Sequence, residues 1–210
     1  MTIGILIIAS YLVGAIPFGL LIAKAHGIDI RTVGSGNIGA TNVSRALGKK
    51  WEYLCFALDV LKGLVPMLAA MILLPAVLTT AKIGLWLGVG AAAVLGHVFP
   101  VYLKFKGGKG VATSLGVVLG LWPFYTIVGL ITFVIWAVVV KTWRYISLGS
   151  IVGAVIFPLL LATAICIIPQ WRFTVLWPLL VAAVALAAVL IIRHKDNIKR
   201  LLAGTENKIG

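Results

Sequence analysis

Five long runs without Asp, Glu, Lys or Arg constrain the fold of this chain more than any other feature. The runs cover residues 3–23, 83–103, 110–140, 146–170 and 173–192. A helix needs about 20 apolar residues to cross ~30 Å of hydrocarbon. Only helices and closed barrels satisfy their backbone in lipid, and no segment alternates as a barrel strand would. The sequence therefore predicts an all-α, polytopic integral membrane protein, with a single domain over residues 1–210.

The charge of the chain has an explanation in the bilayer. The net charge of +13 could indicate a nucleic-acid partner, but the basic residues lie in short segments between apolar runs. Membrane proteins carry such positive charge on their cytoplasmic side. We therefore expect the lipid bilayer, and no nucleic acid, as the surroundings of this protein.

The position of the basic residues predicts the topology. Most of them lie in four segments: 24–50, 104–109, 141–144 and 193–208. If these segments share the cytoplasmic face, the N-terminus is outside, the C-terminus is cytoplasmic, and the number of crossings is odd. Run 110–140 must then cross twice, with a break at Pro123 and short helices at about 111–122 and 124–140. The apolar run that contains Asp59 and Lys62 is the second span, so the total is seven transmembrane helices; the alternative is one long tilted span over 110–140 and six in total.

A glycine-rich segment at residues 34–45 is typical of phosphate binding. It combines permissive backbone with polar and cationic side chains: Ser35, Gly36, Asn37, Thr41, Asn42 and Arg45. Glycine exposes backbone N–H groups to a ligand, and Arg matches phosphate oxygens. A helix that begins near Ala40 would add its dipole. The alternative is a flexible turn. The GxGxxG spacing does not indicate a dinucleotide site, because an apolar helix precedes it.

Two further segments carry cations beside hydrogen-bonding groups. Residues 96–113 include Lys106-Gly-Gly-Lys109 but lack P-loop spacing, and ordinary loop charge is the alternative explanation. His97 could carry protons or pack as a hydrogen-bonded histidine. In residues 193–206, a helix would place His194 and Asn197 on one side, and a solvated basic cap is the alternative.

Few side chains are available for acid and base chemistry. The chain has five acidic residues, no Ser-His-Asp set, and no aspartate five positions after His97 or His194. It also lacks metal-ligand spacing, so we expect no metal and no cofactor, and two cysteines in apolar runs indicate no disulfide. Asp59 and Lys62, spaced i and i+3 in an apolar run, can neutralise each other and are functional candidates. Rich in anion binders and poor in bases, the chain suits an already activated substrate.

Together, GSGNIGATN (34–42), GHVFPVYLKFKGGKGVAT (96–113) and RHKDNIKRLLAGTE (193–206) resemble the acyl-phosphate-dependent glycerol-3-phosphate acyltransferase (PlsY) family over the whole chain. The resemblance implies an enzyme that transfers a fatty acyl group from acyl phosphate to the sn-1 hydroxyl of glycerol 3-phosphate. The products are lysophosphatidic acid and phosphate, in bacterial phospholipid synthesis. It places the site on the cytoplasmic side of the cell membrane, and it suggests association with the enzyme that makes acyl phosphate.

The resemblance also assigns residues. It implies catalytic roles for Ser35, Asn37, His194 and Asn197. It implies phosphate binding by Gly36, Thr41, Asn42, Arg45, Lys106 and Ser147. Both substrates carry phosphate, so two anion sites are expected side by side. Oriented N–H groups and cations would stabilise the oxyanion.

Two other functions are compatible with a basic membrane protein. A transporter of acidic metabolites usually shows two related halves with interrupted helices near the midplane. No such internal symmetry is evident here. A membrane scaffold would not need three clustered phosphate-type segments.

Overall fold

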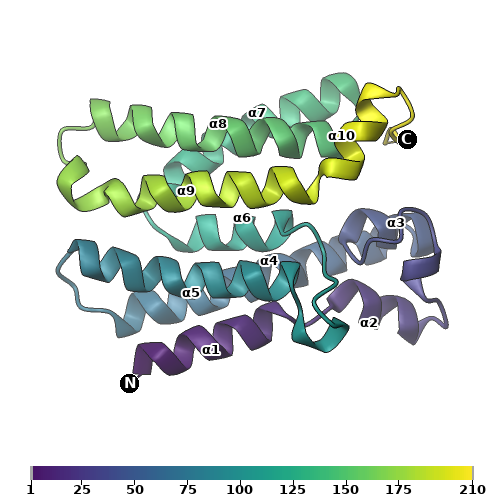
Figure 1. Cartoon of the computed structure of the whole chain (residues 1–210), viewed down its shortest axis with the longest axis horizontal. Coiled ribbons are helices and arrows are strands. Elements are labelled where there is room, and N and C mark those ends of the chain that lie inside the picture. The colour runs from purple at the N-terminus through teal and green to yellow at the C-terminus, as the bar shows by residue number, and fades with distance from the viewer. Residues whose placement is uncertain (1, 210) are drawn as a thin grey trace. The chain divides into compact units, whose positions relative to one another are not determined.

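The computed structural model describes residues 2–209, and within them every regular element is a helix (Figure 1). The elements are α1 (Thr2–Gly14), α2 (Phe18–Ala25), the 3-10 turn η1 (Ile30–Thr32), α3 (Ala40–Leu47), α4 (Lys49–Leu73), α5 (Thr80–Val98), the 3-10 turn η2 (Val101–Leu103), α6 (Val111–Gly120), α7 (Phe124–Trp143), α8 (Ile146–Ile167), α9 (Phe173–Arg193) and α10 (Lys195–Leu202). The predicted all-α class is confirmed.

The helices form two compact units. The first contains the residues up to Leu74 together with Gly88–Gly120, and the second contains Pro75–Leu87 and the residues from Leu121 onward. Helix α5 therefore contributes residues to both. The single domain over residues 1–210 stays a prediction.

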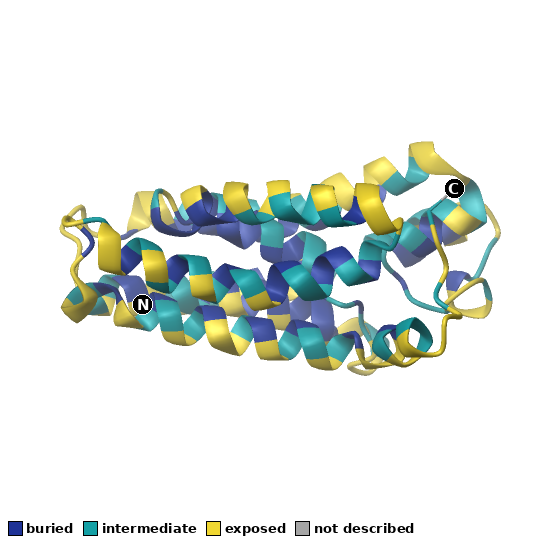
Figure 2. Ribbon diagram, turned by 90° about the horizontal axis from the view of Figure 1, so that it is seen from above, coloured by how far each residue is buried: buried dark blue, intermediate teal, exposed yellow. Residues whose placement is uncertain are grey.

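Six helical segments of the described chain are long and apolar enough to cross a bilayer: 2–25, 49–73, 80–103, 124–143, 146–167 and 173–193. Large apolar side chains are exposed along these helices. Along the ribbon, exposed positions alternate with buried ones (Figure 2). A lipid-facing helix requires that pattern, since its outer side chains meet hydrocarbon and not water. The protein is thus a multi-pass membrane protein.

The break predicted at Pro123 is confirmed. Helix α6 ends at Gly120, and α7 begins at Phe124. With ten residues, α6 is shorter than each of the six candidate spans. The count of seven crossings therefore stays a prediction.

Glycines allow the helices of the first unit to pack closely. A Cβ at Gly116 of α6 would overlap the Val60 carbonyl oxygen of α4, and one at Gly63 of α4 would overlap the Thr113 carbonyl oxygen of α6. Small residues at such contacts let helix backbones approach each other in a membrane. The loops at the ends of α4 and α6 are thereby held by a rigid pair of helices.

The first apolar run lies in one candidate span, residues 2–25, but its helix is interrupted. Helix α1 ends at Gly14 and α2 begins at Phe18. Pro17 explains the break, because in a continuous helix its ring would clash with the carbonyl group four residues earlier, and it has no N–H to donate. The carbonyl oxygen of Ile16 accepts hydrogen bonds from Phe18 N–H (3.1 Å) and from Nζ of Lys62 on α4 (2.8 Å).

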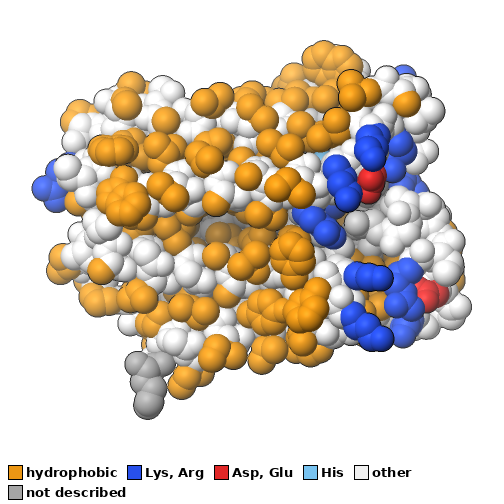
Figure 3. Space-filling view, viewed as in Figure 1, with side chains coloured by type: hydrophobic (Ala, Val, Ile, Leu, Met, Phe, Trp, Pro, Cys, Tyr) orange, Lys and Arg blue, Asp and Glu red, His pale blue; other side chains and the backbone are white. Residues whose placement is uncertain are grey.

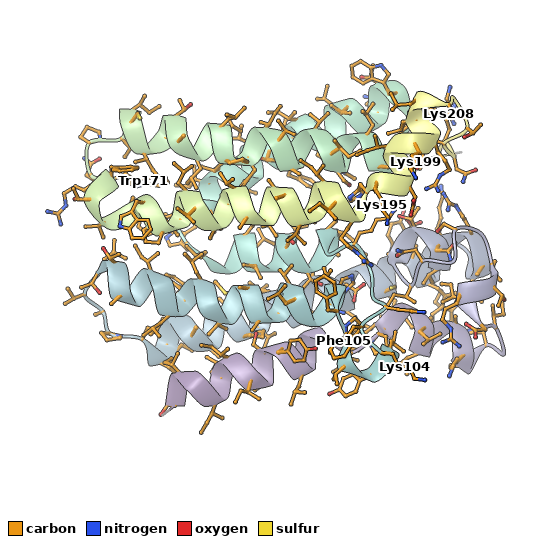
Figure 4. All side chains as sticks on the ribbon, in the orientation of Figure 1. Lys104, Phe105, Trp171, Lys195, Lys199 and Lys208 are labelled. Carbon is orange, nitrogen blue, oxygen red and sulfur yellow. The ribbon has the colours of Figure 1, made fainter. Side chains whose placement is uncertain are left out.

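In the second unit, aromatic side chains join α7, α8 and α9. The hydroxyl of Tyr125 donates to the Leu179 carbonyl of α9 at 2.5 Å, and its ring meets Phe157 of α8 edge-on at 5.0 Å. The Phe124 ring packs similarly on Trp171, at the end of α9 opposite α10 (Figure 4). These contacts fix the helices that carry Ser147 and the third segment.

Candidate functional site

The first glycine-rich loop has a defined conformation that requires glycine at two positions. Gly34 and Gly36 have φ angles of 57° and 67°, in the left-handed region. A Cβ at Gly34 would also overlap Oδ1 of Asn42. The backbone can therefore turn sharply here, in a conformation that residues other than glycine rarely adopt. An ordered turn replaces the flexible one that was the alternative.

Asn42 holds this loop together. Its side chain is buried, its Nδ2 donates to the carbonyl oxygens of Ile30 (3.1 Å) and Val33 (2.9 Å), and its Oδ1 accepts from Ser35 N–H (2.9 Å). These three bonds use much of the capacity of the amide. The observed role of Asn42 is thus to shape the loop, and its direct contact with phosphate stays a prediction.

Helix α3 begins where the loop ends. It starts at Ala40, as predicted, after Gly39. Oδ1 of Asn37 accepts a hydrogen bond from Gly39 N–H at 3.0 Å, which fixes the entry into the helix. The first N–H groups of a helix have no acceptor inside it, so the turn that contains Thr41 presents donors toward the loop.

An apolar cluster supports the loop from beneath. Ile30, Ile38 and Val43 are buried with residues of α2 and α4, and Leu103 of η2 packs against the same cluster. Ser35 and Arg45 remain exposed above it. The loop is thereby rigid on its apolar side and open on its polar side, as an anion site requires.

An exposed ion pair lies in the segment that leads into the loop. The Arg31 guanidinium lies 2.6 Å from the Asp29 carboxylate, and Arg31 N–H also donates to it. The hydrogen bonds from the Arg31 side chain and backbone lower the pKa of Asp29 to about 2. Asp29 therefore stays ionised and caps η1 at physiological pH.

The second glycine-rich segment contains strained backbone. Lys104 and Phe105 have φ angles of 50° and 62°, although neither is glycine (Figure 4 labels both). A left-handed conformation at such residues costs about 1–3 kcal/mol each and persists only where surrounding structure enforces it. Strained backbone conformations are common at ligand sites. The next residue after Phe105 is the exposed Lys106.

His97 of α5 packs against this segment. Its backbone oxygen accepts from Gly108 N–H at 3.1 Å. A Cβ at Gly108 would overlap the imidazole Nε2, and one at Gly107 would overlap the His97 carbonyl oxygen. Of the two predicted roles of His97, the packing role is observed. The glycines are needed here for close approach, and not only as flexible linkers.

The third segment is helical, and its predicted residues are buried. Within α10 and its cap, His194 and Asn197 are 2% and 5% exposed, whereas the labelled Lys195 and Lys199 project outward (Figure 4). The His194 Nδ1 lies 2.7 Å from the Leu190 carbonyl oxygen. Because a carbonyl only accepts, Nδ1 carries the hydrogen and the ring orientation is fixed. The segment is therefore more than a solvated basic cap.

Glu206 is the centre of this part of the site, and we assigned it no role from the sequence. Its Oε1 accepts from Ser147 Oγ (2.8 Å) and Asn197 Nδ2 (2.6 Å), and its Oε2 accepts from Arg200 Nε (2.7 Å). One carboxylate thus joins α8, α10 and the C-terminal segment. The Ser147 hydroxyl has one hydrogen, which is directed at Glu206, so its donation to phosphate stays a prediction.

The ionised form of Glu206 is favoured. Burial of the side chain, which is 6% exposed, opposes ionisation, but hydrogen bonds from Asn197, Arg200 and Ser147 outweigh it. Together they lower the pKa of Glu206 below its ordinary value of 4.5. The carboxylate therefore holds these donors throughout the neutral range.

Cationic side chains gather near these loops in each unit. In the first unit, Lys and Arg lie around the end that carries α3, and in the second around α10 (Figure 3). Over residues 2–209, no group of three or more His, Cys, Asp or Glu side chains could hold a metal ion. The described groups can bind anions, orient them and donate hydrogen bonds.

We expect the stability of the second unit to depend on Glu206 and on pH. A carboxylate with a lowered folded-state pKa contributes stability above its ordinary value, and this is lost as pH falls below about 4.5. Glu206→Gln should lower the melting temperature at pH 7 by roughly 2–6 °C and flatten its decline between pH 7 and pH 3. Thermal unfolding in detergent measures both, with Glu52→Gln as the control. Matching pH profiles for wild type and Glu206→Gln would contradict this assignment.

Comparison with known proteins identifies the family. The family model described as "Glycerol-3-phosphate acyltransferase" matches residues 4–204. Proteins of that name from Trichlorobacter lovleyi and Geotalea daltonii are 49% and 47% identical to the chain, covering 99% and 97% of it and 98% and 95% of their own lengths.

Two solved structures are also similar. Crystal structures of the integral membrane glycerol 3-phosphate acyltransferase PlsY, in its glycerol 3-phosphate and lysophosphatidic acid forms, match with TM-scores of 0.86 and 0.83. Each is 42% identical, and the match covers 100% of this chain and 96% of the other. The segments singled out above lie almost wholly inside the matched residues. The chain belongs to the glycerol-3-phosphate acyltransferase family.

Proposed function

We propose that this acyltransferase moves a fatty acyl group from acyl phosphate to the sn-1 hydroxyl of glycerol 3-phosphate, giving lysophosphatidic acid and phosphate. The acceptor is supported by the family and by the glycerol 3-phosphate form of the similar PlsY structure. The donor is supported by the scarcity of bases, because a mixed anhydride has a good leaving group and needs little covalent help. The reaction belongs to bacterial phospholipid synthesis.

The first glycine-rich loop is the observation that carries this proposal. Two left-handed glycines, the Asn42 bonds and the start of α3 form an ordered turn whose polar side is open. The N–H groups of Ser35, Gly36 and Gly39 donate within the loop, so the first N–H groups of α3 and the polar side chains are the donors offered to a phosphate. We assign one phosphate to this loop, with Ser35, Gly36, Asn37 and Thr41 as its contacts and Asn42 as the residue that shapes it.

Cations and the third segment complete the assignment. We assign Arg45 and Lys106 to a second phosphate, since both cationic side chains are exposed and long enough to reach it. His194 and Asn197 are proposed to orient substrate, because Nδ1 of His194 and the amide of Asn197 are already fixed by their neighbours. A residue with a fixed orientation loses less entropy when it binds.

The proposed chemistry is a direct transfer. The glycerol hydroxyl oxygen attacks the acyl carbonyl carbon, a new C–O ester bond forms, and the bond between that carbon and the phosphate oxygen breaks. Phosphate leaves with the bonding electron pair, and a phosphate oxygen takes the hydroxyl proton. N–H groups and cations stabilise the negative charge on the carbonyl oxygen, and binding both substrates together supplies proximity.

We also propose that the site faces the cytoplasm of the cell membrane, with the N-terminus outside and seven crossings. The distribution of basic residues supports this orientation. Association with the enzyme that synthesises acyl phosphate would deliver the donor at that face.

Phosphate release tests the donor. Purified protein in detergent should release phosphate from palmitoyl phosphate only when glycerol 3-phosphate is added, with equal amounts of lysophosphatidic acid, because transfer links the two products. Malachite-green detection and mass spectrometry measure them. Turnover of acyl-CoA with none of acyl phosphate would overturn the donor assignment.

Arg45→Ala tests the phosphate contacts. Loss of a charge-assisted hydrogen bond should raise the apparent KM for a phosphorylated substrate by about 10- to 100-fold. Steady-state kinetics with each substrate varied in turn gives the value. Lys49→Ala, at an exposed cation four residues on, is the matched control and should change KM less than twofold. An unchanged KM in Arg45→Ala would remove Arg45 from the site.

Cysteine labelling tests the orientation. In a Cys166→Ser background, Lys141→Cys in intact cells should resist an impermeant maleimide, whereas Lys82→Cys should react. Lys141 is exposed and Lys82 is partly exposed, and the seven-span topology places them on opposite faces. Labelling at position 141 from outside would favour the six-span alternative.

A further inference from the structure

Three ionisable side chains lie buried together in the first unit. Nζ of Lys62 lies 2.7 Å from Oδ1 of Asp59 on α4, and Nδ1 of His97 on α5 lies 3.7 Å from the same oxygen. Their side chains are only 2–5% exposed. The proposed reaction uses none of the three. We call Asp59, Lys62 and His97 the buried triad.

One side of the buried triad leads to the first glycine-rich loop. The Lys62 ammonium donates to the Ile16 carbonyl at 2.8 Å and lies 5.6 Å from the centre of the Phe18 ring, so it fixes the point where α2 begins. The next residue, Gly19, packs against the loop so closely that a Cβ would overlap the Ile38 carbonyl oxygen. The position of Lys62 therefore influences the base of the loop through Phe18 and Gly19.

A second contact on this side involves Cys55, one turn before Asp59. Its Sγ lies 3.8 Å from Asp59 Oδ2, and it belongs to the apolar cluster beneath the loop. A Cβ at Gly19 would also press on this sulfur. Asp59 therefore contacts both the ammonium that fixes α2 and the cluster that supports residues 34–42.

The other side of the buried triad leads to the second glycine-rich segment. Gly108 N–H donates to the His97 carbonyl oxygen at 3.1 Å, and a Cβ at Gly108 would overlap the His97 ring. The strained residues Lys104 and Phe105 lie just before this contact. Phe105 N–H donates to the Pro100 carbonyl within the segment, and the contact of Gly108 with His97 holds the segment to α5.

Net stability does not explain the buried triad. The desolvation of two charges offsets most of their attraction, and apolar side chains of similar size are often as stable. What the charges do supply is direction, because the ammonium contacts both the Ile16 carbonyl and Asp59 Oδ1, and Asp59 Oδ2 lies beside Cys55 Sγ. The contacts end at two loops that both carry proposed phosphate ligands.

We propose that the buried triad is a positioning network, which holds the glycine-rich loops of the first unit in register and so sets the affinity for glycerol 3-phosphate. Asp59, Lys62 and His97 touch no substrate; they act through residues 34–45 and 104–110. This rests on the proposed function for its kinetic consequence, but the geometric consequence can be measured without turnover.

The double variant Asp59→Asn/Lys62→Met separates positioning from stability. Lys62→Met alone leaves a buried carboxylate without its ammonium and should lower the melting temperature by roughly 6–20 °C. The double variant removes both charges and should recover most of that loss. Its kcat/KM for glycerol 3-phosphate should still fall about tenfold, mainly through KM, because displaced loops lose binding geometry.

Distances between the loops give the second readout. Spin labels at Thr32→Cys and Tyr102→Cys, both exposed and outside the proposed phosphate contacts, should show a wider or shifted distance distribution in the double variant than in wild type. The background is Cys166→Ser, since Cys166 is exposed and Cys55 is buried. Ser10→Ala is the matched control: it removes a buried hydrogen bond to Val89 in the same unit and should leave distances and KM unchanged.

The outcomes are distinct. A double variant with wild-type distances and wild-type kcat/KM would overturn the positioning network. If wild type itself shows no turnover, the proposed function fails, and the distance distribution alone decides the network. If the double variant does not fold, His97→Gln, which leaves the ion pair intact, takes its place. Unchanged distances and KM in that variant would equally overturn the proposal.

Discussion

A chain in a bilayer must satisfy its backbone polar groups internally, and the hydrogen bond from Lys62 to the Ile16 carbonyl does this where the first apolar helix is interrupted. A backbone carbonyl without a partner in hydrocarbon costs several kcal/mol, so a helix can break there only if another group replaces the lost bond. At this break the Ile16 carbonyl accepts from Phe18 N–H at 3.1 Å and from Lys62 Nζ at 2.8 Å, and Asp59 neutralises the ammonium. After the break, α2 packs against the first glycine-rich loop, where Gly19 closely approaches the Ile38 carbonyl.

Much of this architecture could be predicted from local sequence. Apolar runs identified the spans, Pro123 identified the break between α6 and α7, and a glycine followed by polar residues identified the start of α3 at Ala40. The pairing of Asp59 with Lys62 followed from helical spacing. Each of these depends on residues a few positions apart, where sequence and geometry are closely linked.

The features that escaped prediction depend on contacts between distant residues. Pro17 could have indicated the break after Gly14, but the partner of Ile16 lies 46 positions away. Glu206 is one of only five acids, which was a usable signal, yet its bond to Ser147 spans 59 positions. The role of Asn42 required knowing where the loop backbone turns. Composition indicates that such groups matter, but only the fold shows which partner each one has.

The acidic residues have a consequence for how such a chain can change over generations. Asp29, Asp59 and Glu206 are each in an ion pair, and Glu52 and Asp196 occupy the first turns of α4 and α10. Losing Asp59 alone would leave an ammonium unneutralised in hydrocarbon, and losing Lys62 alone would leave a carboxylate. A lineage can therefore exchange this pair only through a defective intermediate or through two simultaneous changes. The ion pair therefore predicts that the two positions change together between lineages.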